Sequence, residues 1–249
     1  MKQFIKLILV FAFCFNLFAV PQTILFIGNS YFYYNDSLHN HLRRMLEEKY
    51  PEMKFTFKSS TISAARLHHH NFDHLIEHKN LGVETRYDLV IMQAGSFEFS
   101  SSSLKNKYLA TVKENVSKAE KKGIKTALYM FHDYLPYERR FREDNYEDIV
   151  KTHRKAAREN NSLLLPIAIA FARAYEEKPD IKLHHIDGSH PSLLGHYLAA
   201  YTVFAFLTDS SPVGLKYNYL EKVAEEDAYF LQKVAWDTYN QEKKLTPKK

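Results

Sequence analysis

The hydrophobic residues of the chain fall into short runs that alternate with amphipathic stretches. A continuous apolar run of strand length indicates a strand buried on both faces, whereas strict alternation indicates an edge strand that is covered on one face only. Continuous runs occur at residues 24–27, 89–92, 126–131 and 163–169, and an alternating run occurs at residues 54–60. The pattern therefore predicts five strands.

Helical periodicity separates these strands, with apolar positions three and four residues apart. It occurs at residues 38–49, 104–122 and 146–160, and two further helices are predicted at residues 191–207 and 217–239. Strands that alternate with helices of this length predict βαβ units and a parallel sheet with helices on both faces. We see no repeat and no linker, so residues 21–242 are expected to form one domain.

The first twenty residues have a different character. Lys2 and Lys6 form a short basic start, an apolar stretch follows, and Ala19 offers a small residue near a cleavage point. This pattern is typical of a secretory signal peptide, and the apolar stretch is shorter than the roughly 20 residues that span a bilayer. We therefore expect residues 1–20 to be removed and the mature protein to be secreted or periplasmic, without stable membrane insertion.

Cysteine content and charge narrow the chemistry. Cys14, the single cysteine, lies inside the signal segment, so the mature chain has no thiolate nucleophile and no cysteine metal ligand. The formal net charge is +5, and residues 243–249 form a lysine-rich end that is interpreted as a solvated tail. No nucleic-acid-binding motif accompanies it, and no nucleic-acid partner is expected.

The best candidate for chemistry is a serine at the end of the first strand. Ser30 follows Gly28 and Asn29 at the point where α/β folds place reactive groups. Near the other end of the chain, Asp187 and His190 are three residues apart, a spacing that lets a carboxylate orient an imidazole. A serine needs such a base to become a nucleophile. The alternatives are a helix-capping serine and an ordinary surface turn.

Four segments together resemble the SGNH/GDSL hydrolase superfamily. They read ILFIGNSYFYYN, DLVIMQAGS, PIAIAFARAY and DGSHPSLLGHYLAAYTVFAFL, and they look closest to a bacterial subgroup with GNS in place of GDS. The resemblance implies a flavodoxin-like three-layer α/β/α sandwich with a five-stranded parallel sheet. It also implies hydrolysis of esters, often acetyl groups on carbohydrate, through an acyl-serine. Residue by residue, it makes Ser30 the nucleophile, His190 the base and Asp187 its orienting acid.

The resemblance also implies an oxyanion hole, and here the sequence departs from the family pattern. Family members use the backbone N–H of the serine, that of a glycine and an asparagine side chain. In this chain the donors would be Ser30, then Ala64 or Ala65 at the glycine position, and Gln93 in place of asparagine. A buried glutamine that binds loop backbone is the alternative interpretation of Gln93.

Other polar and aromatic clusters have weaker signals. His70, His74 and His78 would share one face if the segment were a single helix, but no carboxylate-rich set completes a metal site, and a polar surface is the favoured interpretation. No metal and no organic cofactor is expected. His132 and Asp133 end the fourth strand at the same edge as Ser30. The aromatic residues that follow Ser30 are expected partly to pack in the core and partly to stack on a sugar ring.

These observations predict a secreted serine esterase that acts on an acyl ester, such as an acetyl ester of a small molecule or carbohydrate. The alternative is a catalytically weak or inactive carbohydrate-binding protein, which the absent asparagine and the alanines of the second segment would explain. A phosphorus or thioester substrate on the same scaffold is a third possibility. The acyl group and the alcohol of the substrate are left open, because loops set specificity and the fold does not determine it. The oligomeric state is also left open.

Overall fold

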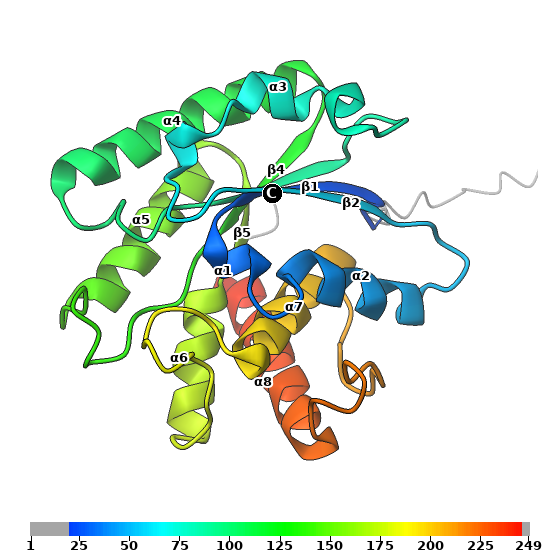
Figure 1. The fold of residues 1–249 in the computed structure, drawn as a ribbon, viewed down its shortest axis with the longest axis vertical. Coiled ribbons are helices and arrows are strands. Elements are labelled where there is room, and N and C mark those ends of the chain that lie inside the picture. Colours follow the sequence, from blue (N-terminus) through cyan, green and yellow to red (C-terminus); the bar gives the residue numbers. More distant parts are fainter. Residues whose placement is uncertain (1–19, 246–249) are drawn as a thin grey trace, which may run out of the picture.

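The computed structural model describes residues 20–245, and most of the predicted signal peptide lies outside them. Its centre is a sheet of five parallel strands in the order β2-β1-β3-β4-β5. Figure 1 shows this sheet nearly edge-on, between two layers of helices. The strands are β1 (Thr23–Gly28), β2 (Thr56–Thr61), β3 (Leu89–Gln93), β4 (Lys125–Tyr129) and β5 (Leu163–Leu165). The sheet confirms the predicted parallel α/β architecture.

Helices cover both faces of the sheet and complete the three layers. One face is covered by α2 (Leu38–Lys49), α6 (Ile167–Glu177), α7 (Leu193–Thr208) and α8 (Glu225–Leu245) (Figure 1). The other face is covered by α3 (Phe72–Ile76), α4 (Ser102–Lys121) and α5 (Asn145–Glu159). Three short turns, α1 (Ser30–Tyr33), η1 (Leu67–His69) and η2 (His78–Leu81), lie in the connections.

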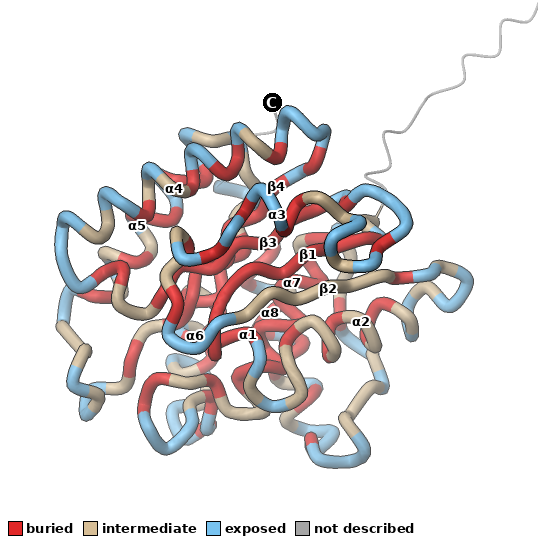
Figure 2. Tube along the Cα trace, turned by 45° about the horizontal axis from the view of Figure 1, so that its top comes forward, coloured by how far each residue is buried: buried red, intermediate tan, exposed pale blue. Residues whose placement is uncertain are grey.

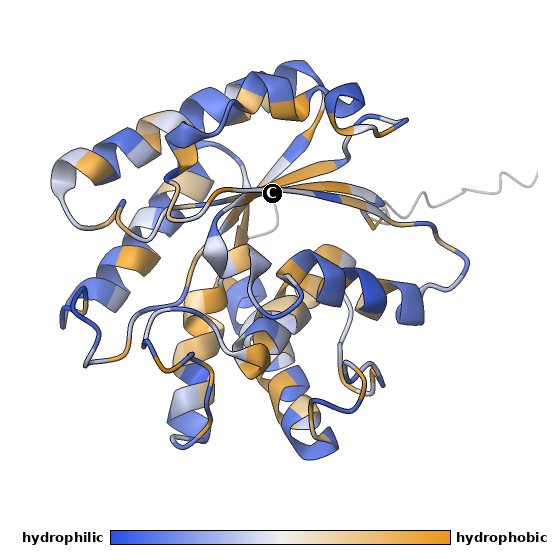
Figure 3. Ribbon diagram, viewed as in Figure 1, coloured by the Kyte–Doolittle hydropathy of each residue, from blue (hydrophilic) through white to orange (hydrophobic). Residues whose placement is uncertain are grey.

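Burial follows the hydropathy pattern. Every residue of β1 and β3 is buried, whereas β2 at the edge is half-buried, as the alternating pattern predicts (Figure 2). Apolar residues fill the strands and the helix faces turned toward them (Figure 3). Helix α7 is apolar on nearly all sides because it contacts α2, α6 and α8. Within residues 20–245, no helix combines the length and hydropathy that a membrane span requires.

Several predicted boundaries are wrong. The apolar run at 163–169 is not one strand: β5 ends at Leu165, Pro166 caps the next helix, and α6 begins at Ile167. A short apolar run does not distinguish a buried strand from a buried helix, and proline cannot continue the ladder of hydrogen bonds. The helix predicted at 191–207 begins at Leu193, because Ser192 accepts a hydrogen bond from the Gly195 N–H as its N-cap.

The C-terminal part also differs from the expectation. Helix α8 begins at Glu225, eight residues later than predicted, and extends to Leu245, three residues into the expected tail. Lys243 in that last turn pairs with Asp209 at 2.5 Å, so residues 243–245 are helical, although their side chains are exposed to solvent. The histidine segment forms η1, α3 and η2 instead of one helix. His70, His74 and His78 therefore share no single helix face, and no group of potential metal ligands gathers within the described residues.

The topology explains where a site can form. Strand β1 pairs with β2 on one side and β3 on the other, so the connections after β1 and β3 lead to opposite faces of the sheet. Such a change of direction opens a crevice at the carboxyl ends of the strands. Ser30 follows β1 directly and therefore lies at this crevice.

Candidate active site

The structure brings Ser30, His190 and Asp187 together although they are far apart in the sequence. His190 Nδ1 lies 2.6 Å from Asp187 Oδ2, and His190 Nε2 lies 2.8 Å from Ser30 Oγ. Because an ionised carboxylate can only accept, Nδ1 carries the proton and Nε2 accepts from the Ser30 hydroxyl. The three side chains thus have the geometry in which a histidine can take a proton from a serine.

The turn before Ser30 depends on Gly28 and Asn29. A Cβ at Gly28 would lie 2.5 Å from Gln93 Oε1 and 2.8 Å from the Phe32 ring, so only glycine fits there. Asn29 caps α1, because its Oδ1 accepts from the Tyr31 N–H at 3.0 Å. The turn therefore holds Ser30 at the start of α1, with 8% of its surface exposed.

Asp187 is held as a carboxylate within its own loop. Burial by itself would raise the pKa of Asp187, but hydrogen bonds from the backbone N–H groups of Ser189 and His190 and from the His190 side chain lower it to about 2. Both backbone bonds to Asp187 Oδ1 measure 2.9 Å. Gly188 has φ +70, and a Cβ there would lie 2.8 Å from the Tyr137 ring. The loop thus needs glycine at 188 and keeps Asp187 ionised.

Buried side chains anchor the loop from below. His132 Nε2–H donates to the Ser189 carbonyl at 2.8 Å, and the Tyr31 hydroxyl bonds to Ser189 Oγ at 2.9 Å. Burial lowers the pKa of His132 well below its usual value, so its ring is neutral. Asp133, next to it, accepts from the Tyr134 N–H and the Asn145 amide. Both residues lie beyond the end of β4 at Tyr129, and not within the strand as the sequence predicted. His132 supports the loop of Asp187, whereas the Asp133 carboxylate binds its own neighbours.

Tyr34 covers His190. The two rings stack with centroids 4.2 Å apart and an interplanar angle of 11°, while Tyr31 approaches His190 edge-on at 5.6 Å. Tyr31 and Phe32 are buried, whereas Tyr33 is 36% exposed. The aromatic run after Ser30 thus divides between core and surface. The stacking of Tyr34 on His190 was not predicted, because the two residues are 156 positions apart in the sequence.

The backbone N–H groups of Ser30 and Ala64 have no hydrogen-bond partner among residues 20–245. Ala64 is exposed and has φ +54. The Ala65 N–H, in contrast, donates to the Ile62 carbonyl at 3.1 Å. Of the two alanines named from the sequence, Ala64 is therefore the one whose N–H is available to a ligand.

Gln93 has both of its amide hydrogens in use. Its Nε2 donates to Asn29 Oδ1 at 2.9 Å and to the Ala94 carbonyl at 3.0 Å, and its Oε1 accepts from the Asn29 N–H at 3.2 Å. The side chain is 1% exposed. In this arrangement Gln93 supports the turn that carries Ser30, and its amide offers no hydrogen to a substrate oxygen.

Asn29 connects the separate parts of the site, a role that the sequence interpretation did not give it. Its Nδ2 donates to the Ala65 carbonyl at 3.1 Å, while Oδ1 accepts from Gln93 and Tyr31. Asn29 thus fixes the turn at Ser30 to the loop that holds Ala64. Its position inside the GNS triplet was the available signal.

Glu98 is a second buried clamp on the same loop. Its carboxyl accepts from the Gly95 N–H at 2.5 Å and the Leu67 N–H at 3.3 Å, and it lies 3.7 Å from His68 Nδ1. Burial raises the pKa of Glu98 to about 7, although these backbone bonds work in the opposite direction. Glu98 therefore joins the loop after β2 to the loop after β3.

A strained segment follows α1. Asn35, Asp36 and Ser37 all have positive φ, between 49° and 68°. Asn35 Nδ2 donates to the Pro191 carbonyl at 2.9 Å and to His196 Nδ1 at 3.1 Å. Backbone strain of this kind persists only where surrounding contacts hold it, and here the contacts tie the segment after Ser30 to the loop of His190.

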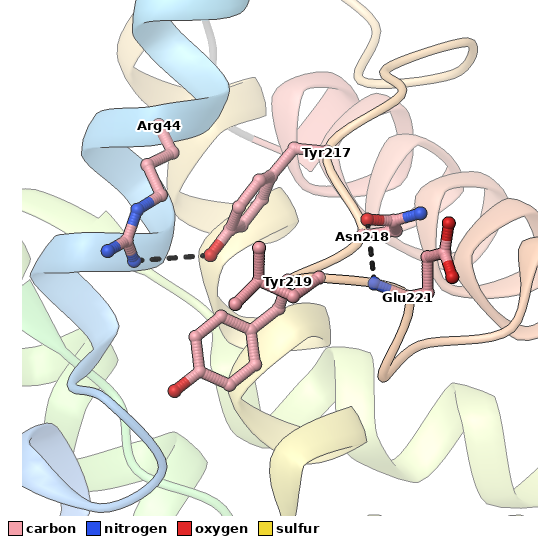
Figure 4. A pocket seen from close by; sticks show the side chains of 6 residues that line it. Arg44, Tyr217, Asn218, Tyr219 and Glu221 are labelled. Carbon is pink, nitrogen blue, oxygen red and sulfur yellow. Dashed lines mark hydrogen bonds between the residues drawn. The ribbon is translucent and has the colours of Figure 1, made fainter.

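A separate hollow lies between α2 and the segment before α8. It has a volume of about 630 Å³, and Arg44 on α2 reaches across to Tyr217, donating to its hydroxyl at 3.2 Å (Figure 4). None of Ser30, Asp187 and His190 lines it. His41 connects this hollow with the strained segment, because Nδ1 contacts the Tyr217 hydroxyl at 3.0 Å and Nε2–H donates to the Asn35 carbonyl at 2.6 Å.

The sheet order, the layers and the convergence of a serine, a histidine and an aspartate define an SGNH/GDSL-like fold. Solved structures of this kind resemble the chain. A DUF4886 family protein from Bacteroides uniformis has a TM-score of 0.71 and 20% identity, over 90% of this chain and 96% of that chain.

Two further solved structures share this fold at lower TM-scores. A protein from Slackia heliotrinireducens assigned to the SGNH hydrolases has a TM-score of 0.58 and 23% identity, over 76% of this chain and 99% of its own. A mutant of an acetyl-xylooligosaccharide esterase from a Geobacillus species has a TM-score of 0.59 and 17% identity, over 75% of this chain and 94% of its own. No protein-family model and no curated protein sequence matches the chain.

Proposed function

We propose that the protein is a serine hydrolase that cleaves an acyl ester, such as an acetyl ester on a carbohydrate, through an acyl-Ser30 intermediate. The observation that carries the proposal is the pair of contacts at His190, 2.8 Å to Ser30 Oγ and 2.6 Å to Asp187 Oδ2. The esterase class of the structural neighbours supports the same reaction. The signal-peptide pattern of residues 1–20 supports secretion of the enzyme.

The reaction has two balanced halves. Ser30 Oγ attacks the acyl carbon while its proton passes to His190 Nε2, and Asp187 stabilises the imidazolium. His190 then gives the proton to the alcohol oxygen as the ester C–O bond breaks. In the second half, water attacks the acyl-serine, loses a proton to His190, and the acid leaves as the proton returns to Ser30.

The oxyanion is assigned to backbone donors. The N–H groups of Ser30 and Ala64 are free of other partners within the described residues; Ser30 begins α1 just after β1, and Ala64 lies in the loop after β2. Preorganised donors aimed at the developing charge are commonly the largest catalytic term. Gln93 serves as a positioning residue in this proposal, because its amide hydrogens are bound to Asn29 and Ala94.

The test uses Ser30→Ala with p-nitrophenyl acetate and a fluorophosphonate probe. We expect wild-type protein to hydrolyse the ester and to take up the probe, and the variant to do neither while keeping its far-UV circular dichroism. Equal turnover by the variant would remove Ser30 from the reaction. A folded wild-type protein that neither reacts with the probe nor hydrolyses the ester would favour the binding protein that the sequence left as the alternative.

A further inference from the structure

Large apolar side chains that remain exposed gather around the proposed triad. The described residues have nine such side chains. Three of them, Tyr33, Ile62 and Ile186, lie on segments that carry proposed site residues, and a fourth, Tyr137, bonds to the segment of Ile186. Tyr33 is in the turn of Ser30, Ile62 is two residues before Ala64, and Ile186 precedes Asp187. Apolar surface that gathers at one place on a monomer is typical of a binding site.

Tyr137 and Ile186 form the most exposed part of this rim. They keep 66% and 86% of their surface open. Tyr137 is nevertheless held in place, because its hydroxyl donates to the Ile186 carbonyl at 3.3 Å and its ring lies against Gly188. An aromatic ring that is exposed and already fixed loses little conformational entropy when a ligand stacks on it.

The exposure indicates which part of an ester substrate this rim would contact. An acyl chain is held best in a concave apolar pocket that buries most of it. The rim instead offers open side chains at a loop surface, and tyrosine presents a flat apolar face with a polar tip that suits an amphipathic ring. Tyr33, whose ring centroid is 5.5 Å from that of Tyr34, continues the aromatic surface toward His190.

We infer that Tyr137, Ile186 and Tyr33 form a saccharide-binding rim that holds the sugar chain bearing the ester while the ester itself lies at Ser30. The inference rests on the proposed function and adds the part of the substrate that the enzyme recognises. It assigns Tyr137 as a residue that determines specificity by stacking on a sugar ring.

The experiment compares Tyr137→Ala with Tyr137→Phe and with Tyr229→Ala. Tyr229 is the matched control, because it is 54% exposed but lies on α8, away from the site loops. The quantity measured is the ratio of kcat/KM for acetylated xylo-oligosaccharide to kcat/KM for p-nitrophenyl acetate. We expect Tyr137→Ala to lower this ratio about tenfold by raising KM for the oligosaccharide, because the loss of one stacking contact has about this effect on binding. Tyr137→Phe and Tyr229→Ala should keep it within twofold.

Three outcomes would overturn the inference and leave the hydrolase proposal standing. The first is an unchanged ratio in Tyr137→Ala, and the second is a wild-type enzyme that cleaves p-nitrophenyl acetate but not the oligosaccharide ester. The third is a Tyr137→Ala variant that selectively loses hydrolysis of p-nitrophenyl octanoate, which would assign the rim to the acyl chain. A binding readout separates the two proposals. Calorimetric titration of xylo-oligosaccharide into Ser30→Ala protein should show binding that Tyr137→Ala removes, whether or not the wild type hydrolyses esters. Absence of binding to the Ser30→Ala protein in that titration would also overturn the inference of a saccharide-binding rim.

Discussion

Two loops contribute to the site at Ser30, and they are held in different ways. The loop with Ala64 follows β2, and the loop with Asp187 and His190 connects α6 to α7. The loop with Asp187 and His190 has two backbone bonds of its own in addition to the contacts of His132 and Tyr31 with Ser189: the Leu135 N–H donates to the Gly188 carbonyl, and the His185 N–H donates to the His190 carbonyl. The loop with Ala64 is fixed by the side chains of Asn29 and Glu98. The proposed base is therefore held by backbone and side-chain contacts together, whereas the proposed oxyanion site depends on two buried residues.

The largest expected effect is on the loop with Asp187 and His190. Asp187→Asn should lower kcat for p-nitrophenyl acetate by about 10³–10⁴-fold, because an amide can favour the wrong tautomer of His190 and cannot stabilise the imidazolium. Steady-state kinetics measures this, and thermal denaturation should show a folded protein. A decrease below tenfold would mean that Asp187 does not orient the base.

Asn29 tests the loop with Ala64. Asn29→Asp keeps the acceptor for Tyr31 and Gln93 but loses the donor to the Ala65 carbonyl and sets two oxygens against each other. We expect a loss of about a hundredfold in kcat, the size of one misplaced oxyanion donor. Asn29→Ala is the companion variant, which should lose more stability because it removes all three bonds. Full activity in Asn29→Asp would contradict the interpretation that Asn29 holds the loop of Ala64 in place.

A substitution at Gln93 tests whether this residue supports the turn of Ser30 or donates a hydrogen bond to the oxyanion. Gln93→Ala leaves the Asn29 N–H and the Ala94 carbonyl unpaired, which should lower the free energy of unfolding by about 1–3 kcal/mol and kcat by about tenfold. Urea denaturation and kinetics measure the two effects. A loss of a hundredfold or more in kcat at unchanged stability would instead make Gln93 an oxyanion donor.

Glu98 predicts a pH dependence of stability. Its folded pKa of about 7 lies above the ordinary value of 4.5, so between these values the folded protein holds a proton that the unfolded chain has released. Stability should therefore fall as pH rises from about 4.5 to about 7, by up to the order of 3 kcal/mol.

Glu98→Gln provides the control for this prediction, because an amide oxygen can still accept from Gly95 and Leu67 but does not titrate. Its melting temperature should vary less across this pH range than that of the wild type. Other charged or titratable groups near Glu98, namely His68, Arg66, Lys107 and Tyr108, remain the same in both proteins. If the melting temperatures of the wild type and the variant changed equally with pH, Glu98 would not be the group that causes the pH dependence of stability.

The smallest effect is expected at Ala64. Ala64→Gly keeps the N–H and removes the cost of positive φ for an L-residue, about 1–2 kcal/mol, while it increases the entropy of the unfolded chain. Activity should stay within about threefold and the free energy of unfolding should rise by about 0.5 kcal/mol, measured by denaturation. A large loss of activity would mean that the Ala64 methyl group itself matters.

The sequence was sufficient for the outline of the fold. Five apolar runs separated by amphipathic stretches predict a parallel sheet, because a strand buried on both faces must be apolar throughout and βαβ connections are right-handed. The failures at residues 163–169 and 217–239 have different causes. At 163–169 an apolar run indicates burial, and both strands and helices can be buried. At 217–239 the helix begins only at Glu225, because Tyr217 and Val223 pack against the core from an irregular segment.

For the site, local spacing pointed to Ser30, Asp187 and His190, since each lies in a turn whose glycine or proline marks unusual backbone. Only the tertiary structure decided how the amide groups are used. Gln93 looked available as a donor, but its hydrogens go to Asn29 and Ala94, and the choice between Ala64 and Ala65 depended on which N–H was left unpaired. Hydrogen bonds between residues 64 positions apart depend on how strands pair, and spacing along the chain does not contain that information.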